Sequence, residues 1–79
     1  MKTKVHVYLK PGVLDVQGKA IEGALHSLGF SEAANVRVGK TIELDLPGAD
    51  AKAAEARARE MAEQLLANTV IESYRVEVG

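Results

Sequence analysis

The segment VRVGKTIELDL, residues 36–46, is compatible with two different structures. It fits a β-hairpin closed by Gly39 and Lys40, and it also fits one strand of about twice the usual length. Directly paired residues of a hairpin share a face, so a two-residue hairpin would turn Ile42 towards solvent and acidic side chains towards the core. A single strand instead gives one apolar face, made by Val36, Val38, Ile42, Leu44 and Leu46. We therefore predict one long strand bent at Gly39; a one-residue bulge is the alternative that would restore a hairpin.

The rest of the chain alternates between strand and helix patterns. Residues 4–9 alternate strictly between apolar and polar side chains, and residues 70–78 do so with one exception, Glu72. Residues 16–28 and 51–68 carry apolar side chains at helical spacing. The order β-α-β-α-β predicts an α+β fold: a two-layer sandwich of a mainly antiparallel sheet with both helices on one face. We expect a single domain over residues 1–79.

The expected helices have recognisable ends. Asp15 and Asp50 are suited to cap their N-termini, and Gly29 is suited to a left-handed C-cap with Phe30 folded back on the first helix. Asn68 is the expected left-handed stop of the second helix, whose core stripe we predict to be Ala54, Ala58, Met61, Ala62 and Leu65. Two glycines inside the first helix call for close approaches, which we assign to the sheet for Gly23 and to a partner for Gly18.

Composition excludes several classes of protein. The 79 residues contain no cysteine, so disulfides and thiolate metal sites are ruled out, and two histidines alone cannot close a zinc site. The net charge of −1 is spread without a basic block, which argues against nucleic-acid binding. No apolar run is long enough for a membrane span. A chain this short buries only about 60% of its unfolded surface, so it needs a very good core or a partner chain.

The predicted long strand favours the partner chain. Eleven residues extend about 36 Å at roughly 3.3 Å each, more than the first strand can cover. The remainder would be an unpaired edge bearing Ile42, Leu44 and Leu46. A second copy of the chain is the economical cover, so we predict a dimer or higher oligomer joined through this strand of the sheet.

The sequence offers little catalytic chemistry. The tetrapeptide VGKT at residues 38–41 resembles the end of a phosphate-binding loop, but Ala34 stands where that motif needs glycine and no helix follows. His6 lies on the polar face of the first strand, and His26 lies in the last turn of the first helix. A small enzyme that uses His6 for acid–base chemistry is one hypothesis, but a flat sheet face offers neither pocket nor nucleophile. We therefore predict no catalytic residue and no metal site.

Three segments carry a family resemblance: LKPGVLDVQGKAIEGALHSLGF, NVRVGKTIELDL and LLANTVIESYRVEV. Together they resemble the PurS family over residues 4–78, the small subunit of phosphoribosylformylglycinamidine synthase. The resemblance implies a cytoplasmic complex for purine biosynthesis, in which a glutaminase subunit releases ammonia and a synthetase subunit uses ATP to form the amidine. It implies that the small subunit is a non-catalytic dimer that binds both partners and assists ammonia transfer. ATP and magnesium are expected on the synthetase, and this chain is expected to hold no cofactor.

The family motif maps onto two groups of positions. Structural roles are expected for Pro11, Gly12, Asp15, Gly29, Gly39 and Asn68. Contacts with partner subunits are expected for Lys10, Gln17, Gly18, Arg37, Lys40, Glu72 and Tyr74. Val16 and Thr69 stand where the family often has proline. The alternative function is a dimeric regulatory module that senses a small molecule.

Overall fold

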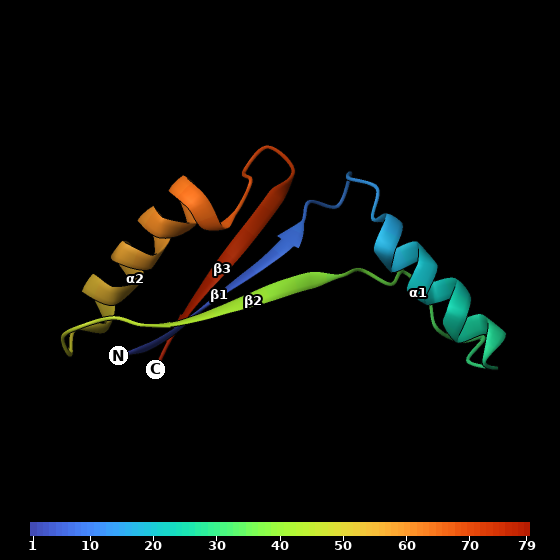
Figure 1. Cartoon of the computed structure of the whole chain (residues 1–79), viewed down its shortest axis with the longest axis horizontal. Coiled ribbons are helices and arrows are strands. Elements are labelled where there is room, and N and C mark those ends of the chain that lie inside the picture. Colours follow the sequence, from blue (N-terminus) through green and yellow to red (C-terminus); the bar gives the residue numbers. More distant parts are fainter.

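Three antiparallel strands form the centre of the computed structural model, which describes all of residues 1–79 (Figure 1). Their spatial order is β2-β1-β3, with β1 (Lys2–Leu9) between β2 (Gly39–Asp45) and β3 (Glu72–Val78). Val5 of the central strand pairs with Ile42 on one side and Val76 on the other. The N- and C-termini lie close together at one end of the sheet (Figure 1). The predicted α+β class and antiparallel sheet are confirmed.

β2 is a single strand, but it is shorter than predicted. No hairpin forms within residues 36–46, because all seven residues of β2 pair with β1, from Gly39 opposite Tyr8 to Asp45 opposite Lys2. Residues 36–38 precede the strand, and the backbone N–H groups of Val36 and Val38 bond to the first helix and its N-cap residue instead. Gly39 is therefore the first residue of β2 rather than a bend within it. The expected unpaired remainder of this strand does not exist, so that reason for an oligomer was wrong.

A seam of alanines brings α2 (Ala51–Met61) close to one face of the sheet. Asp50 caps this helix as predicted, accepting a hydrogen bond from the backbone N–H of Lys52 at 3.0 Å. The residues that face the sheet are small and buried, namely Ala54, Ala58 and Ala62. Val5 and Val7, the fully buried valines of β1, belong to the same core. Small side chains let the helix backbone approach the sheet closely. Each alanine buries little apolar area, but the close approach still closes the core between the helix and the sheet.

A π-helical turn, η1 (Ala62–Leu66), changes which residues face the core. A π turn holds more residues than an α turn, so the apolar stripe shifts along the sequence. Leu65, predicted to lie in the core, is 84% exposed, and Leu66 packs against the core in its place. Asn68 is not left-handed, contrary to prediction; its backbone carbonyl accepts hydrogen bonds at the turn before β3. Val70 lies in that turn, exposed, and not in the strand.

The first helix, α1 (Val16–Ser27), has the predicted ends but not the predicted position. Gly29 adopts a φ of 98°, and the N–H of Phe30 donates to the carbonyl of Leu25 at 2.9 Å, as in a Schellman ending. The helix does not cover the sheet: it projects beyond the end of the sheet, away from α2 (Figure 1). Only α2 forms the second layer, so the prediction of two helices on one face was wrong. No helix of the chain is long and apolar enough to cross a membrane.

The projecting helix makes the molecule unusually extended. Its radius of gyration is 15.8 Å, whereas a compact domain of this length has about 11.6 Å. Its accessible surface is 5501 Å², and a compact monomer of 8.4 kDa exposes about 4,600 Å². The excess of about 900 Å² is close to the roughly 800 Å² that one partner buries in a standard protein interface.

Candidate interaction surface

The junction between α1 and the sheet is organised by the Asp15 carboxylate. Its Oδ1 accepts a hydrogen bond from the backbone N–H of Gly18 at 2.7 Å, which caps the helix. Its Oδ2 accepts one from the backbone N–H of Val38, also at 2.7 Å. The residue is buried, at 4% exposure. The bond from Val38, followed by the bond from Gly18 and the charge of Arg37, lowers the pKa of Asp15 below its ordinary value.

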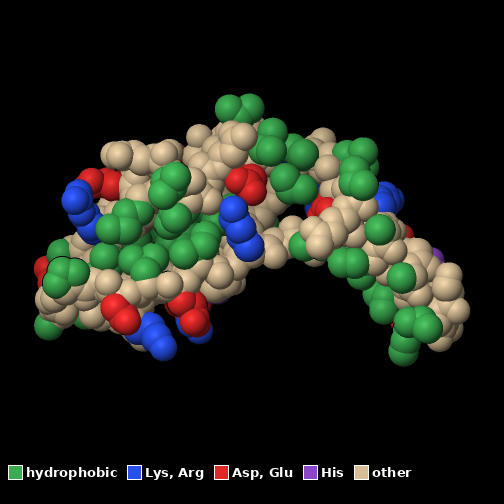
Figure 2. Space-filling model, viewed as in Figure 1, with side chains coloured by type: hydrophobic (Ala, Val, Ile, Leu, Met, Phe, Trp, Pro, Cys, Tyr) green, Lys and Arg blue, Asp and Glu red, His purple; other side chains and the backbone are tan.

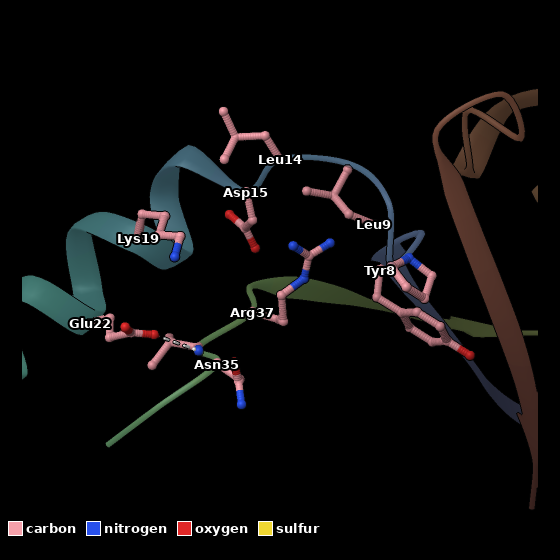
Figure 3. Close-up of a pocket in the computed structure, with 10 residues that line it drawn as sticks. Tyr8, Leu9, Leu14, Asp15, Lys19, Glu22, Asn35 and Arg37 are labelled. Carbon is pink, nitrogen blue, oxygen red and sulfur yellow. Dashed lines mark hydrogen bonds between the residues drawn. The ribbon is translucent and has the colours of Figure 1, made fainter. Parts of the chain in front are cut away.

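Further contacts hold residues 36–38 against the helix. The Glu22 carboxylate accepts a hydrogen bond from the backbone N–H of Val36 at 3.1 Å (Figure 3). Arg37 donates from Nη2 to the carbonyl of Lys10 at 3.0 Å. Gly18 allows the closest approach, because a Cβ on it would lie 2.4 Å from the carbonyl oxygen of Val36. The close partner of Gly18 within this structure is thus its own chain, whereas a Cβ on Gly23 would meet nothing within 4 Å, so the predicted close approach of the sheet to Gly23 was wrong.

Replacing each helical glycine by alanine should have opposite effects on stability. Gly23→Ala fills open space and should stabilise the helix by about 0.5–1 kcal/mol, since alanine is the better helix former. Gly18→Ala forces a methyl group into the Val36 carbonyl and should destabilise the fold despite the same gain in helix propensity. Urea unfolding of the two variants measures both effects. Equal shifts in the two variants would contradict the close approach at Gly18.

Two clefts flank this junction. The larger is an open cleft of about 510 Å³ between the end of β1, the start of α1 and residues 35–37 (Figure 3). Its apolar lining comes from Leu9, Pro11, Leu14 and Val36, and its charged lining from Asp15, Lys19, Glu22 and Arg37. The smaller cleft, about 260 Å³, lies between the sheet and the helix start, where Gln17, Lys40 and Glu72 meet. Both clefts are open to solvent and could receive side chains of a partner.

The apolar side of α1 has no partner within the chain. Figure 2 shows hydrophobic side chains along the projecting helix, apart from those gathered between α2 and the sheet. The largest exposed ones are Leu14, Val16, Ile21, Leu28 and Phe30, which are 38–74% exposed. Large apolar side chains gathered on one exposed helix are typical of an interaction surface, so α1 is a candidate for one.

The polar face of the sheet, on the side that α2 does not cover, contains His6 in a row of hydrogen-bonded side chains. His6 Nε2 donates to Glu77 Oε1 at 2.8 Å, and Nδ1 lies 2.9 Å from the Thr41 hydroxyl. Lys4 and Glu43 form an ion pair beside it at 3.6 Å. His6 lines none of the clefts, and no group of three potential metal ligands occurs in the chain. The row ties the three strands together on this face of the sheet.

Two carboxylates make the stability of the fold sensitive to acid. The hydrogen bond from His6 lowers the pKa of Glu77, and the backbone N–H of Val38 lowers that of Asp15. The stabilisation is therefore complete above about pH 5, where nearly all unfolded carboxyls are ionised, and is lost as the pH falls through the lower folded values. We expect the urea midpoint to drop over that acidic range and to drop less in Glu77→Gln. The exposed Glu32→Gln is the control, and an identical pH profile for Glu77→Gln and the wild type would contradict the assignment.

The structure gives several predicted interface residues a role within the chain. Arg37 bonds to Lys10, Gly18 packs against Val36, and Glu72 accepts a hydrogen bond from the backbone N–H of Asn68 at 2.6 Å. The Tyr74 hydroxyl donates a hydrogen bond to the carboxylate of Glu63, a residue of η1. Gln17 and Lys40 remain free to contact a partner from the smaller cleft. For all seven residues, contact with another subunit stays a prediction. The apolar face of α1 was missed as an interaction surface, because the sequence pattern assigned it to the core.

Comparison with known proteins identifies the family. The family model PurS, described as phosphoribosylformylglycinamidine (FGAM) synthase, matches residues 2–79. The chain belongs to the PurS family. The PurS subunit of FGAM synthase from Bacillus subtilis is 51% identical over 77 residues, which cover 98% of this chain and 90% of that protein. The corresponding subunit from Synechocystis is 44% identical, over 95% of this chain and 75% of that protein.

Solved PurS structures share the fold of this chain. The structure of B. subtilis PurS is 50% identical with a TM-score of 0.86, over 99% of this chain and 96% of that chain. PurS from Methanocaldococcus jannaschii is 35% identical with a TM-score of 0.90, over 99% and 94%. A chain of PurLQS from Thermotoga maritima is 29% identical with a TM-score of 0.87, over 96% and 93%. PurS is a subunit of FGAM synthase, an ATP-dependent ligase complex that hydrolyses glutamine.

Proposed function

We propose that this chain is the non-catalytic subunit that bridges the glutaminase and the synthetase of FGAM synthase. The observation that carries the proposal is the PurS match over residues 2–79, and the PurLQS assembly supports association with other subunits. The chain offers surfaces rather than a reaction site: an apolar helix and two open clefts. In this role it holds its partners together while ammonia passes from the glutaminase to the synthetase. ATP and magnesium belong on the synthetase, and the complex belongs in the cytoplasm.

We infer further that the chain pairs with a second copy of itself through α1. The excess surface of about 900 Å² matches one side of a standard interface. An exposed apolar helix and an open cleft with apolar walls and charged groups occur on the same chain, so a two-fold pair covers both at once. The outer edge of β2 is also unpaired and remains available for pairing through the sheet.

Reconstitution of the complex tests the bridging role. The synthetase and the glutaminase are combined with and without this chain, and amidine formation is measured with glutamine or with ammonium salt as the nitrogen source. We expect glutamine-dependent activity only when the chain is present and ammonium-dependent activity in both mixtures. Full glutamine-dependent activity without the chain would contradict the proposal.

The larger cleft favours a small-molecule sensor as the second candidate function. Its volume of about 510 Å³ lies in the range of ligand pockets, and it combines apolar walls with charged groups of both signs. Thermal unfolding against amino acids and nucleotides tests this function, since a ligand at about 100 times its Kd adds roughly 2.7 kcal/mol of stability. If none of these compounds raises the unfolding temperature, the sensor function is contradicted and the subunit role is the one that remains.

A further inference from the structure

We propose that Asp15 is the positioning residue of the projecting helix, locking α1 at a fixed angle to the sheet. The lock follows from contacts within this chain. Its consequence, that the apolar face of α1 is held ready to receive a second copy, rests on the proposed pairing. Asp15 would then control assembly without touching the partner.

Asp15 makes one hydrogen bond more than capping of the helix requires. One carboxylate oxygen satisfies the Gly18 amide at the helix start, and the second oxygen bonds the Val38 amide, 23 residues further along the chain. Asp50 provides the comparison within the same molecule. It caps α2 through a single backbone bond, to Lys52, and it is exposed. The second bond of Asp15, which is part-buried, therefore serves the junction and not the helix.

The junction decides where the helix points, because α1 has no extensive packing contact with any strand or with α2. The other side-chain bonds across the junction come from Glu22 and Arg37. The Glu22 bond is part-buried like that of Asp15 to Val38 but longer, 3.1 Å against 2.7 Å, and the Arg37 bond is exposed to water. A hydrogen bond accepted by a buried carboxylate is stronger than a hydrogen bond that is exposed to water. Asp15 is thus the strongest link between the helix and the strand that follows residue 38.

The length of the helix amplifies any change at its root. Twelve residues extend about 18 Å, so a tilt of about 15° at Asp15 displaces the far end by about 5 Å. A displacement of that size moves Leu28 and Phe30, near the far end, by about one helical turn relative to a partner surface. The pairing surface therefore depends on the angle that the lock sets.

Asp15→Asn separates the lock from the cap. The amide oxygen of asparagine still accepts from Gly18, and asparagine caps helices about as well as aspartate. Its NH₂ group cannot accept from Val38. Two controls replace a carboxylate by an amide at positions where the angle of α1 is expected to stay unchanged. Glu22→Gln keeps an oxygen for the Val36 amide, and Asp50→Asn changes the cap of α2.

Spin-label distances measure the angle directly. The chain has no cysteine, so cysteines introduced at the exposed positions Ser27 and Ala56 label α1 and α2 selectively. Labelled chains are studied in an excess of unlabelled chains, so that only distances within one chain are recorded. We expect Asp15→Asn to broaden the distance distribution with helix content unchanged by circular dichroism. The self-association Kd should rise about ten- to a hundredfold, while the two controls behave as the wild type.

The outcomes separate the lock from the pairing. A distance distribution in Asp15→Asn as narrow as that of the wild type overturns the lock. A wild type that does not self-associate contradicts the pairing instead, and the distances still decide the lock. Should Asp15→Asn lose helix content, Asp15→Ser repeats the test, because its hydroxyl can cap Gly18 but is too short to hold Val38 as well. Broadening in that variant supports the lock, and a wild-type distribution overturns it.

Discussion

Ile21→Glu in α1 is expected to convert a paired chain into a folded monomer. Ile21 lies on the apolar side of the projecting helix, is 38% exposed, and has no helix or strand packed extensively against it. Full burial of isoleucine contributes about 1.5–3 kcal/mol, and Ile21 is 38% exposed, so pairing adds a part of that contribution in each copy and a two-fold pair loses it twice. Leaving an unpaired carboxylate in the interface adds to the loss. The self-association Kd should therefore rise by more than about 100-fold, as measured by sedimentation.

The same substitution should leave the monomer intact, because glutamate is a better helix former than isoleucine. His26→Glu is the control: it places the same residue on the same helix, about 140° around its axis from Ile21 and on the side away from the apolar residues. This variant should pair like the wild type. If both variants pair normally, the apolar face of α1 is not the interface.

Ala58→Leu is expected to cause the largest loss of stability among single changes in α2. Ala58 is fully buried in the seam that brings the helix onto the sheet. Added carbon atoms there must push the helix away from β1, and such overpacking costs typically about 1–3 kcal/mol. For a domain of this size, each kcal/mol lowers Tm by about 4–8 °C. Thermal unfolding at a fixed protein concentration measures the shift.

Ala56→Leu provides the comparison for this prediction, because Ala56 is exposed on the same helix. Both variants change helix propensity equally, so the difference between their Tm values reports the packing term alone. A Tm for Ala58→Leu within the range of Ala56→Leu would mean that the seam is looser than the structure shows.

Local sequence patterns predicted the elements well, because their determinants are local. Alternation defined the strands, Asp15 and Asp50 capped the helices, and Gly29 ended α1 as expected. The extra residue of the π turn was not predictable in this way. It depends on how the end of α2 meets the sheet, and it moved Leu65 out of the core.

The position of α1 could not be predicted from its pattern. An amphipathic helix has the same pattern whether its apolar face meets its own sheet or another chain. Asp15 decides between the two by bonding the Val38 amide, which shortens β2 and fixes the helix beyond the end of the sheet. A cap is visible in sequence, but the second bond of its carboxylate is a long-range contact and is not.

The mass of the wild-type chain in solution tests most directly the claim that this is an assembly subunit with a helix made for a second copy. Sedimentation equilibrium at micromolar concentration should give at least twice the chain mass of 8.4 kDa. Dilution should then dissociate the pair before the chain unfolds. A folded species that stays at 8.4 kDa at every concentration would contradict the account.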